Sequence, residues 1–383
     1  MTKPGPKRSL RGGQRYPRTL RPTSAAEPKK ALAVRDTTNQ RKLEHIKIIS
    51  EDEGTDRRKY YFDQIRLRHR ALPEINLEEV ETSVEFMGKR LACPLLISGM
   101  TGGDDPAMVR INQNLAEAAE LRQVAMSVGS QRVFFTNPKA RASFALREIA
   151  STTLLFANLG AVQLNKGFGI EECRDAVNML DADALYLHLN PLQEAVQPEG
   201  DTQFGGLIEK IGGISWALNK PVILKEVGAG ISREDVKLAI PRGIRFIDVA
   251  GSGGTSWSRI EHHRRADDDN DDAGLLFQDW GIPTPRALWE LRDLRSEVTL
   301  IASGGIRSGI DVAKALILGA SLCGLAAPFL KPAQESADAV MAVIDRLRHE
   351  LRIAMFLLGV RRVADLIGNT KLLLDLPFAE NAP

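Results

Sequence analysis

The chain has 383 residues, 43% of them hydrophobic and 26% charged, so it can bury a large core and is neither disordered throughout nor collagen-like. Its three cysteines, Cys93, Cys173 and Cys323, are too few and too scattered for a disulfide framework or a CxxC metal site, which favours a reducing compartment. No apolar stretch approaches the roughly 20 residues that span a bilayer, so we expect no membrane span.

The first 35 residues differ from the rest of the chain in charge and in proline content. They carry ten Lys or Arg against one acid, Glu27, whereas the remainder has seven more acids than bases. They also hold five prolines and show neither an apolar run nor a helical period. This composition predicts a disordered basic tail over residues 1–37 and a single domain over residues 38–383. A transit peptide, or nonspecific attraction of RNA by charge alone, is an alternative for the tail.

From about residue 94 onward, short apolar runs alternate with amphipathic stretches. The apolar runs predict strands at 94–98, 123–127, 153–158, 184–190, 221–227, 244–250, 298–303 and 321–326. The amphipathic stretches predict helices at 106–121, 138–150, 170–180, 207–219, 233–240, 285–295, 308–318 and 333–358. Because the strand runs are continuously apolar rather than alternating, we expect burial on both faces and therefore a parallel sheet.

Eight strand-then-helix units in roughly 260 residues match the size of an α/β protein of the (β/α)8 TIM-barrel type. A doubly wound open sheet has the same alternation, so the strand count alone does not decide. Nearly every predicted strand ends in a cluster of Gly and small polar residues. Since only a barrel brings all eight of those ends to one mouth, we predict the barrel. Residues 41–93 are expected to form short pieces that cap or flank it.

Two glycine-rich segments follow the last two predicted strands. Residues 303–309, with the sequence SGGIRSG, run into a predicted helix, and residues 324–327 follow the eighth strand. Glycines let the backbone approach an anion, a helix start offers unpaired N–H groups, and Arg307 adds charge. Barrels commonly bind a phosphate here, so we expect a phosphate site, with a plain glycine turn as the alternative. No GxGxxG motif indicates a Rossmann site.

Lys225 lies within the fifth predicted strand, in the sequence VILKEV. At an inward position it would be buried at the barrel mouth, where a lysine needs an anionic partner or loses its charge. Such a lysine is either a Schiff-base nucleophile or a charge partner for an electron-rich cofactor ring. The sequence leaves these two interpretations open.

A second polar cluster surrounds the fourth predicted strand. His188 and Asn190 project to the same side, and Gln193 and Glu194 follow in the loop. A histidine at a barrel mouth beside a carboxylate favours a chemical role over a core role. Mg²⁺ typically takes one or two carboxylates plus phosphate oxygens, so Glu194 would suffice for a diphosphate ligand. The acidic run 267–272 lacks the glycine and glutamate of a calcium loop and is expected to be solvated.

A third cluster stands just after the basic tail. Arg41, Lys42 and His45 recur at one-turn spacing on a predicted helix start. Such a set can clamp an anion, because cations three or four residues apart lie on one helical face. The alternative is an ordinary charged helix start, and the segment alone does not separate the two.

Nine motifs occur in the order of one family. They are RKLEH, SGMTGG, SVGSQR, ANLG, HLNPLQE, QPEGDTQF, KEVG, GSGGTSW and SGGIRSG. MTGG or SGG alone is a weak signal, but the ordered set, from about residue 38 to the C-terminus, resembles the FMN-dependent type 2 isopentenyl-diphosphate isomerases. The resemblance implies a (β/α)8 enzyme that interconverts isopentenyl and dimethylallyl diphosphate by an allylic 1,3 proton shift. It further implies reduced FMN, Mg²⁺ and NADPH as the source of reducing equivalents.

The implied reaction needs an acid at the terminal alkene carbon and a base at the allylic carbon, with carbocation character building between them. A reduced flavin held over the alkene can stabilise that charge and exchange a proton at N5, so the cofactor supplies the difficult chemistry. An aromatic face such as that of Trp257 can favour the same positive charge.

The resemblance also implies roles for individual residues. FMN contacts are implied for Met100, Thr101, Gly102, Ser130, Asn158, Thr255, Gly305, Ile306, Arg307, Ala326 and Ala327, with Lys225 at the N1 and O2 side of the ring. Substrate contacts are implied for Arg41, Lys42, His45, Ser130, Gln131, Arg132 and Gln193, and the Mg²⁺ ligand is Glu194. The groups around the reacting hydrocarbon, taken as catalytic, are His188, Gln193, Trp257 and Glu261. Which of them moves a proton stays open.

Three other functions are alternatives to the isomerase. An FMN oxidoreductase of the hydroxy-acid oxidase or inosine-monophosphate dehydrogenase kind is the nearest, but the latter needs a cysteine in a mouth loop, where none falls. A lyase acting through Lys225 would need no flavin, and RNA binding would rest on the tail alone. The resemblance further implies a homo-oligomer, a tetramer or octamer. We expect a cytoplasmic enzyme of small diphosphates without a specific nucleic-acid or membrane partner.

Overall fold

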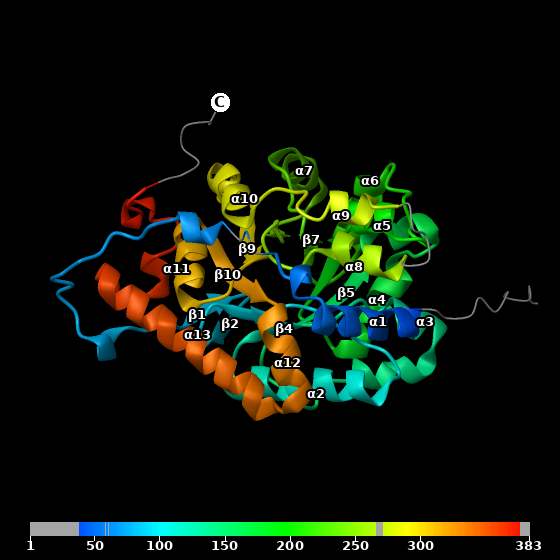
Figure 1. The fold of residues 1–383 in the computed structure, drawn as a ribbon, viewed down its shortest axis with the longest axis horizontal. Coiled ribbons are helices and arrows are strands. Elements are labelled where there is room, and N and C mark those ends of the chain that lie inside the picture. Colours follow the sequence, from blue (N-terminus) through cyan, green and yellow to red (C-terminus); the bar gives the residue numbers. More distant parts are fainter. Residues whose placement is uncertain (1–37, 58, 60, 266–270, 376–383) are drawn as a thin grey trace, which may run out of the picture. The chain divides into compact units, whose positions relative to one another are not determined.

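The computed structural model describes residues 38–57, 59, 61–265 and 271–375 (Figure 1). The predicted tail over residues 1–37 and most of the acidic run lie outside the described residues. Eight parallel strands close into a barrel in the order β10-β3-β4-β5-β6-β7-β8-β9, which confirms the predicted fold and excludes the open sheet. The strands are β3 (Leu95–Ile97), β4 (Ala125–Ser127), β5 (Leu155–Gly160), β6 (Ala184–Leu189), β7 (Val222–Glu226), β8 (Phe246–Asp248), β9 (Thr299–Ser303) and β10 (Ala320–Leu325).

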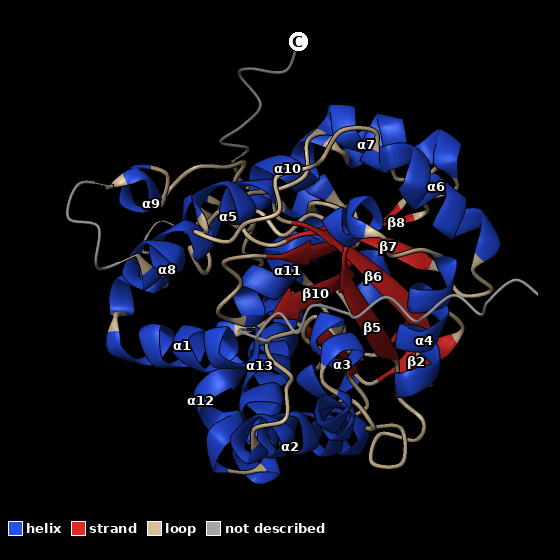
Figure 2. Cartoon of the chain, turned by 90° about the vertical axis from the view of Figure 1, so that its right-hand side faces the viewer, coloured by secondary structure: helices blue, strands red, loops and turns tan. Residues whose placement is uncertain are grey.

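Helices surround the barrel strands (Figure 2). The α-helices are α1 (Thr38–Glu51), α2 (Pro106–Arg122), α3 (Arg132–Thr136), α4 (Ile170–Leu180), α5 (Pro191–Val196), α6 (Leu207–Ala217), α7 (Arg233–Ala239), α8 (Trp257–Arg264), α9 (Ala273–Leu276), α10 (Thr284–Glu290), α11 (Gly309–Ile317), α12 (Ala327–Glu335) and α13 (Ala337–Leu358). Short 3-10 turns are η1 (Glu53–Thr55), η2 (Phe62–Gln64), η3 (Leu77–Glu79), η4 (Pro138–Ser143), η5 (Ala161–Lys166), η6 (Ile240–Arg242), η7 (Arg292–Leu294), η8 (Val363–Asp365) and η9 (Thr370–Leu372). Among the described residues, no helix is both long and apolar enough to cross a membrane.

Three of the predicted helices were wrong in extent. The helix predicted over 285–295 ends at Glu290 as α10 and is followed only by the turn η7. Residues 138–150 hold only the turn η4, at whose end the carbonyl of Ser143 accepts from the Asn112 side-chain amide at 2.8 Å. The last predicted helix, 333–358, is two helices that meet at Ser336. That residue is extended, with φ of −166°, and its hydroxyl caps α13 by accepting from the backbone N–H of Ala339.

The amino end of the barrel is closed by a hairpin. β1 (Val84–Phe86) and β2 (Lys89–Leu91) pair antiparallel just before the first barrel strand. Phe86 and Leu91 are buried in the same apolar cluster as Leu96, Phe156 and Ile301 of the barrel strands. The segment before the barrel therefore does cap it, as the sequence predicted for residues 41–93.

Helix α1 lies beside α8 in Figures 1 and 2. Ionic contacts join the two helices. Glu44 of α1 lies 3.2 Å from the Arg264 guanidinium, and His45 lies 3.1 Å from the Glu261 carboxylate. The same face of α1 contributes to a cavity at the carboxyl ends of the strands. A helix far from the barrel strands in sequence is thus placed at their functional end.

Candidate active site

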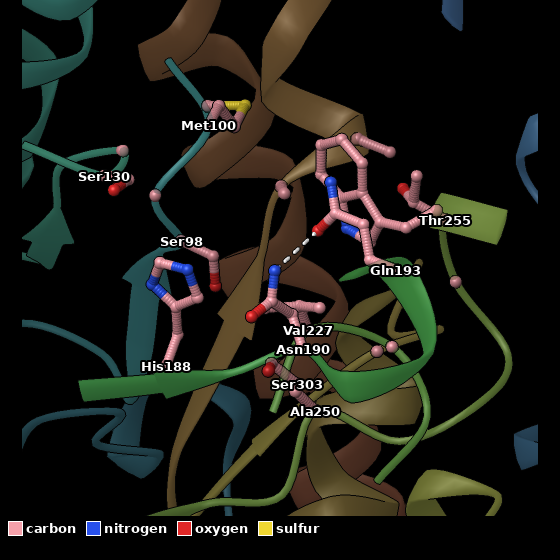
Figure 3. A pocket seen from close by; sticks show the side chains of 18 of the residues that line it. Ser98, Met100, Ser130, His188, Asn190, Gln193, Val227, Ala250, Thr255 and Ser303 are labelled. Carbon is pink, nitrogen blue, oxygen red and sulfur yellow. Dashed lines mark hydrogen bonds between the residues drawn. The ribbon is translucent and has the colours of Figure 1, made fainter. Parts of the chain in front are cut away.

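A cavity of about 440 Å³ opens where the barrel strands end at their carboxyl side (Figure 3). Its wall is formed by residues at or after the end of each strand from β3 to β10, together with α1. The convergence of eight strand ends on one cavity is the arrangement that a barrel dictates. The predicted site residues found on this wall are Arg41, Lys42, His45, Met100, Thr101, Ser130, Arg132, Asn158, His188, Gln193, Glu194, Lys225, Thr255, Trp257, Gly305, Ile306, Arg307, Ala326 and Ala327.

Three predicted site residues do not line the cavity. Gln131 is fully buried, and its amide is used inside the protein, accepting from the Asn158 backbone N–H at 2.9 Å and donating to the Ala176 carbonyl at 2.9 Å. The Gln131 side chain thus has partners inside the protein, and its substrate contact stays a prediction. Gly102 is packed against the Phe144 ring, where a Cβ would lie within 2.3 Å of a ring carbon. Glu261, also fully buried, lies behind the cavity wall.

The loops after β8 and β9 touch each other through glycines. A Cβ on Gly254 would lie 2.8 Å from the backbone nitrogen of Gly305, and one on Gly304 would lie 2.1 Å from the carbonyl oxygen of Gly251. Gly304 and Gly305 have φ of +94° and +81°, which other residues rarely adopt. We call this surface, formed by Gly251, Gly254, Gly304 and Gly305, the glycine wall. Bare backbone of this kind suits a phosphate, and α12 starts nearby without a side-chain cap.

Arg307 fixes the glycine wall to the segment that precedes the barrel. Its guanidinium donates to the carbonyls of Gly253 at 3.0 Å and Gly305 at 2.9 Å. It also donates to the Asp56 carboxylate at 2.6 Å and the Arg57 carbonyl at 2.7 Å. Arg307 lines the cavity as predicted, and these contacts add a loop-holding part that the sequence did not indicate.

Lys225 is paired with a buried acid that the sequence interpretation missed. Its ammonium lies 3.1 Å from the carboxylate of Asp248 and donates to the Ser303 hydroxyl at 3.0 Å. Asp248 also accepts from Tyr186 at 3.1 Å, and burial together with this carboxylate raises the pKa of Tyr186 so that it remains a donor. A lysine held this way favours the charge partner over the nucleophile. The available signal was the acid at the end of the apolar run FID, in register with Lys225.

His188 is held as a neutral side chain with a defined proton. Its Nδ1 lies 2.8 Å from Oδ1 of Asn158, whose own amide nitrogen donates to the Val128 carbonyl at 3.0 Å. Nδ1 therefore carries the proton and donates, which leaves Nε2 as an acceptor. Burial, and then the positive charges of Lys225 and Lys42, lower the pKa of His188 to about 4. At neutral pH this ring can accept a proton at Nε2.

Glu194 is buried on the cavity wall, next to a buried amide oxygen that has no hydrogen-bond partner. Its carboxylate accepts from the Asn190 amide at 2.9 Å and from the Asp201 backbone N–H at 2.6 Å. The amide oxygen of Asn190 is buried without a hydrogen-bond partner. In the part of the chain that the structure describes, no group of three or more His, Cys, Asp or Glu could hold a metal ion. A cation at Glu194 would therefore need oxygen ligands from a substrate or water.

Glu261 organises two residues of the wall from behind. Its carboxylate lies 3.1 Å from His45 Nε2 and accepts from the Gln193 amide at 2.8 Å and the Arg264 guanidinium at 2.6 Å. Burial would raise the pKa of Glu261, but these hydrogen bonds lower it to about 2. The Trp257 ring packs edge-on against His45 at 5.2 Å. Glu261 is thus an ionised orienting group, and His45, Gln193 and Trp257 are the ones that reach the cavity.

Two cations of α1, Arg41 and Lys42, and one of α3, Arg132, line the cavity. Arg132 is paired with Asp201 at 3.1 Å and Arg41 with Glu199 at 3.7 Å. The Lys42 ammonium donates to two backbone carbonyls of the loops after β3 and β4, at 2.5 Å and 2.9 Å. Such a cluster suits a multiply charged anion. We call the surface formed by Arg41, Lys42, His45, Arg132, Gln193 and Glu194 the side-chain wall.

Two buried hydroxyls without a hydrogen-bond partner bear on whether the cavity fits a flavin nucleotide. Ser98 Oγ and Thr101 Oγ1 are buried without a hydrogen-bond partner, and both residues line the cavity. Buried hydroxyls are normally satisfied, so their partners are expected to come from a bound group. With the glycine wall for a phosphate and Lys225 for the polar edge of a ring, the residues present fit FMN. Ser98 is a further residue that the sequence interpretation did not single out.

Comparison with known proteins places these features in a family. Residues 34–135 and 191–373 match the FMN-dependent dehydrogenase family. An isopentenyl-diphosphate delta-isomerase of Paracoccus zeaxanthinifaciens is 55% identical over 337 residues, which cover 87% of this chain and 96% of the relative. A protein of the same name from Hydrogenovibrio crunogenus is 52% identical over 334 residues, covering 87% and 97%.

Solved structures share the fold at lower identity. The flavin-binding domain of baker's yeast flavocytochrome b2 superposes with a TM-score of 0.62 at 18% identity, covering 87% of this chain and 82% of that one. A mandelate oxidase variant with an FMN adduct superposes with a TM-score of 0.54 at 21% identity, covering 80% and 87%. At this identity the likeness concerns the fold alone.

Proposed function

The chain belongs to the family of FMN-dependent isopentenyl-diphosphate delta-isomerases, and on that premise we propose how its residues carry out the reaction. The protein interconverts isopentenyl diphosphate and dimethylallyl diphosphate by an allylic proton shift, with reduced FMN and Mg²⁺. The observation that carries this proposal is that the glycine wall and the side-chain wall belong to one cavity. One wall suits the phosphate of a flavin nucleotide and the other suits a diphosphate.

FMN would be held mainly by backbone and by short side chains. The glycine wall and the start of α12 offer amides for the ribityl phosphate, and Ser98 and Thr101 offer hydroxyls without another partner. Lys225 places a cation at the ring, where it favours the reduced, electron-rich form. When bound, reduced FMN would supply electron density to stabilise developing positive charge and a site for proton exchange. The contacts implied for Met100, Ser130, Asn158 and Thr255 belong to the same proposal.

The substrate diphosphate would lie against the side-chain wall. Arg41 and Lys42 of α1 and Arg132 of α3 offer positive charge, and each is already held by partners at the cavity edge. Charge-assisted hydrogen bonds from such preplaced groups cost little reorganisation on binding. Glu194 with the diphosphate oxygens would complete a Mg²⁺ site, since one carboxylate is sufficient when phosphate supplies the other ligands.

The hydrocarbon part of the substrate would lie near groups whose protonation state is set by their surroundings in the protein. His188 stays neutral with Nε2 as an acceptor, because burial and nearby lysines oppose its protonation. Glu261 stays ionised and holds Gln193 and His45 in fixed orientations. The Trp257 face can favour positive charge that develops on the hydrocarbon. These residues orient the alkene and exclude water while protons are exchanged.

We also propose NADPH as the reductant, cytoplasmic location and a homo-oligomeric assembly, all from the family resemblance. Because the isomerisation has no net redox change, the reductant would be needed only to bring the cofactor to its reduced state. Large apolar side chains on the surface support self-association, among them Leu276, 81% exposed, and Trp280, 61% exposed.

The proposal is tested by anaerobic incubation of the purified protein with isopentenyl diphosphate, FMN, Mg²⁺ and NADPH. We expect a yellow protein that bleaches with NADPH and forms dimethylallyl diphosphate in large excess over the NADPH consumed. The matched control leaves the bound FMN oxidised and should give little product. Absence of dimethylallyl diphosphate would contradict the proposal. Reduction of the bound FMN by a 2-hydroxy acid would instead support the oxidoreductase alternative.

A further inference from the structure

A buried carboxylate lies just beyond the cavity wall and has no part in the assignments above. Asp248, the last residue of β8, has no exposed surface. It accepts from the Ser303 hydroxyl at 2.5 Å and the Tyr186 hydroxyl at 3.1 Å, and it lies 3.1 Å from the Lys225 ammonium. Lys225 and Ser303 line the cavity, whereas Asp248 and Tyr186 do not.

Stability alone does not account for this carboxylate. Tyr186 belongs to the apolar cluster inside the barrel, with Ile223 and Ile301, so Asp248 lies next to an apolar interior. Removing a carboxylate from water costs several kcal/mol, and replacing a buried ion pair by apolar residues is often neutral or stabilising. A pair retained at such a place, with one member on the cavity wall, therefore points to a use in the site.

The geometry fixes one end of a flexible side chain. A lysine ammonium sits on a four-carbon stem with several rotatable bonds, so it has no defined place unless it is anchored. Ser303 accepts one N–H of Lys225, the Asp248 carboxylate lies 3.1 Å from the same ammonium, and Ser303 itself donates to Asp248. Because an ammonium has three donors, Lys225 keeps donor capacity for a ligand in the cavity.

We propose that Asp248 is a positioning residue, which holds the Lys225 ammonium at the cavity wall so that its charge acts on the flavin ring. This inference rests on the proposed function, because it assumes the place of Lys225 beside bound FMN. Asp248 touches neither cofactor nor substrate and acts through Lys225 alone. The FMN reduction potential is therefore the property that Asp248 should control.

The test is a double-mutant cycle on the reduction potential of bound FMN, measured in the wild type, Lys225→Met, Asp248→Asn and the double variant. Loss of the cation disfavours the negatively charged reduced flavin, so Lys225→Met should lower the potential. Asp248→Asn should lower it in the same direction. We expect about a tenfold loss in preference for reduced over oxidised FMN, which is about 30 mV for a two-electron couple. In the Lys225→Met background, Asp248→Asn should not lower the potential further, since no ammonium is left to position.

Two further variants keep the test decisive. Tyr186→Phe removes one neutral hydrogen bond to the same carboxylate but leaves the Lys225–Asp248 pair, so its potential should stay at the wild-type value. If Asp248→Asn fails to bind FMN, Ser303→Ala removes the other anchor of Lys225 and should lower the potential in its place. Thermal unfolding of each variant checks that the fold is retained.

The proposal is overturned if Asp248→Asn leaves the potential unchanged or raises it, or if its full shift persists without Lys225. If Lys225→Met itself leaves the FMN reduction potential unchanged, the proposed position of Lys225 beside the ring is wrong. The proposed role of Asp248 is then wrong as well. Dimethylallyl diphosphate formation by the wild type is measured separately. A failure of the isomerase assignment is therefore distinguishable from a failure of this inference.

Discussion

The two walls of the cavity are built by opposite means. The glycine wall consists of backbone from two neighbouring strand ends, and it depends on the absence of side chains. The side-chain wall gathers polar and charged groups from α1, α3 and α5, far apart in the sequence, and its Arg and Lys side chains are held by acidic or carbonyl partners. The first is specified by shape and the second by charge. Substitutions that add volume should therefore damage one wall, and substitutions that remove charge should damage the other.

The largest effect is expected from Gly305→Val, which adds volume to the glycine wall. Its Cβ would lie 2.8 Å from the backbone of Gly253, and the residue has φ of +81°, which a β-branched side chain cannot adopt without strain. We expect FMN affinity to fall about a thousandfold, or about 4 kcal/mol, measured by flavin fluorescence. Gly213→Val, on an exposed helical position with open space around it, is the matched control. Equal FMN affinity in Gly305→Val and the wild type would contradict the role of the glycine wall.

A second experiment asks how strongly burial and the nearby cations Lys225 and Lys42 oppose protonation of His188. The pKa of His188 falls from 6.5 to about 4, so the unfolded chain takes up a proton below pH 6.5 that the folded protein refuses until about pH 4. The free energy of unfolding should therefore fall as pH falls through this window, by about 3 kcal/mol from this residue. Above pH 6.5 the residue contributes no pH dependence.

Urea unfolding of His188→Gln across that window measures the contribution of His188. The variant should lose about 3 kcal/mol less stability than the wild type between pH 6.5 and pH 4. His349→Gln, at an exposed position on α13, serves as the control and should follow the wild type. Parallel pH profiles for wild type and His188→Gln would show that the environment of His188 does not oppose its charge.

A smaller effect is expected from Glu194→Gln, which removes charge from the side-chain wall at nearly constant volume. A neutral amide oxygen is a weaker Mg²⁺ ligand than a carboxylate. The Mg²⁺ concentration for half-maximal isomerisation should rise about thirtyfold, or about 2 kcal/mol, while FMN affinity is retained. Glu209→Gln, which makes the same change on exposed α6, should leave the metal titration in place. An unchanged titration in Glu194→Gln would rule out metal ligation by this residue.

The smallest effect is expected from deletion of residues 1–35, which the sequence predicts to be a disordered basic tail. The isomerisation rate and KM should stay within about twofold of the full chain, as expected when a segment contributes no contact to the site. Steady-state kinetics of both proteins make the comparison. A large rise in KM for the truncated protein would give the basic tail a part in binding the diphosphate.

The sequence predicted the features that depend on local pattern. The eight strands appear where continuous apolar runs stood, and the glycine segments lie at the cavity because a barrel brings strand ends together. It did not predict Asp248, because an acid at the end of an apolar run looks the same whether it faces solvent or a buried lysine. It placed Gln131 in the site on the strength of a motif, although tertiary packing turns its amide inward. Partners that lie far apart in the chain were beyond local inference.

The hairpin at the amino end of the barrel affects how ligands enter and leave the cavity. Phe86 and Leu91 occupy the space through which a ligand would leave at that end. Substrate and product therefore use the same opening at the carboxyl ends of the strands. A product molecule must leave through it before the next substrate molecule enters. The two isomeric diphosphates should consequently exclude each other, so that accumulation of either one slows turnover of the other by simple competition.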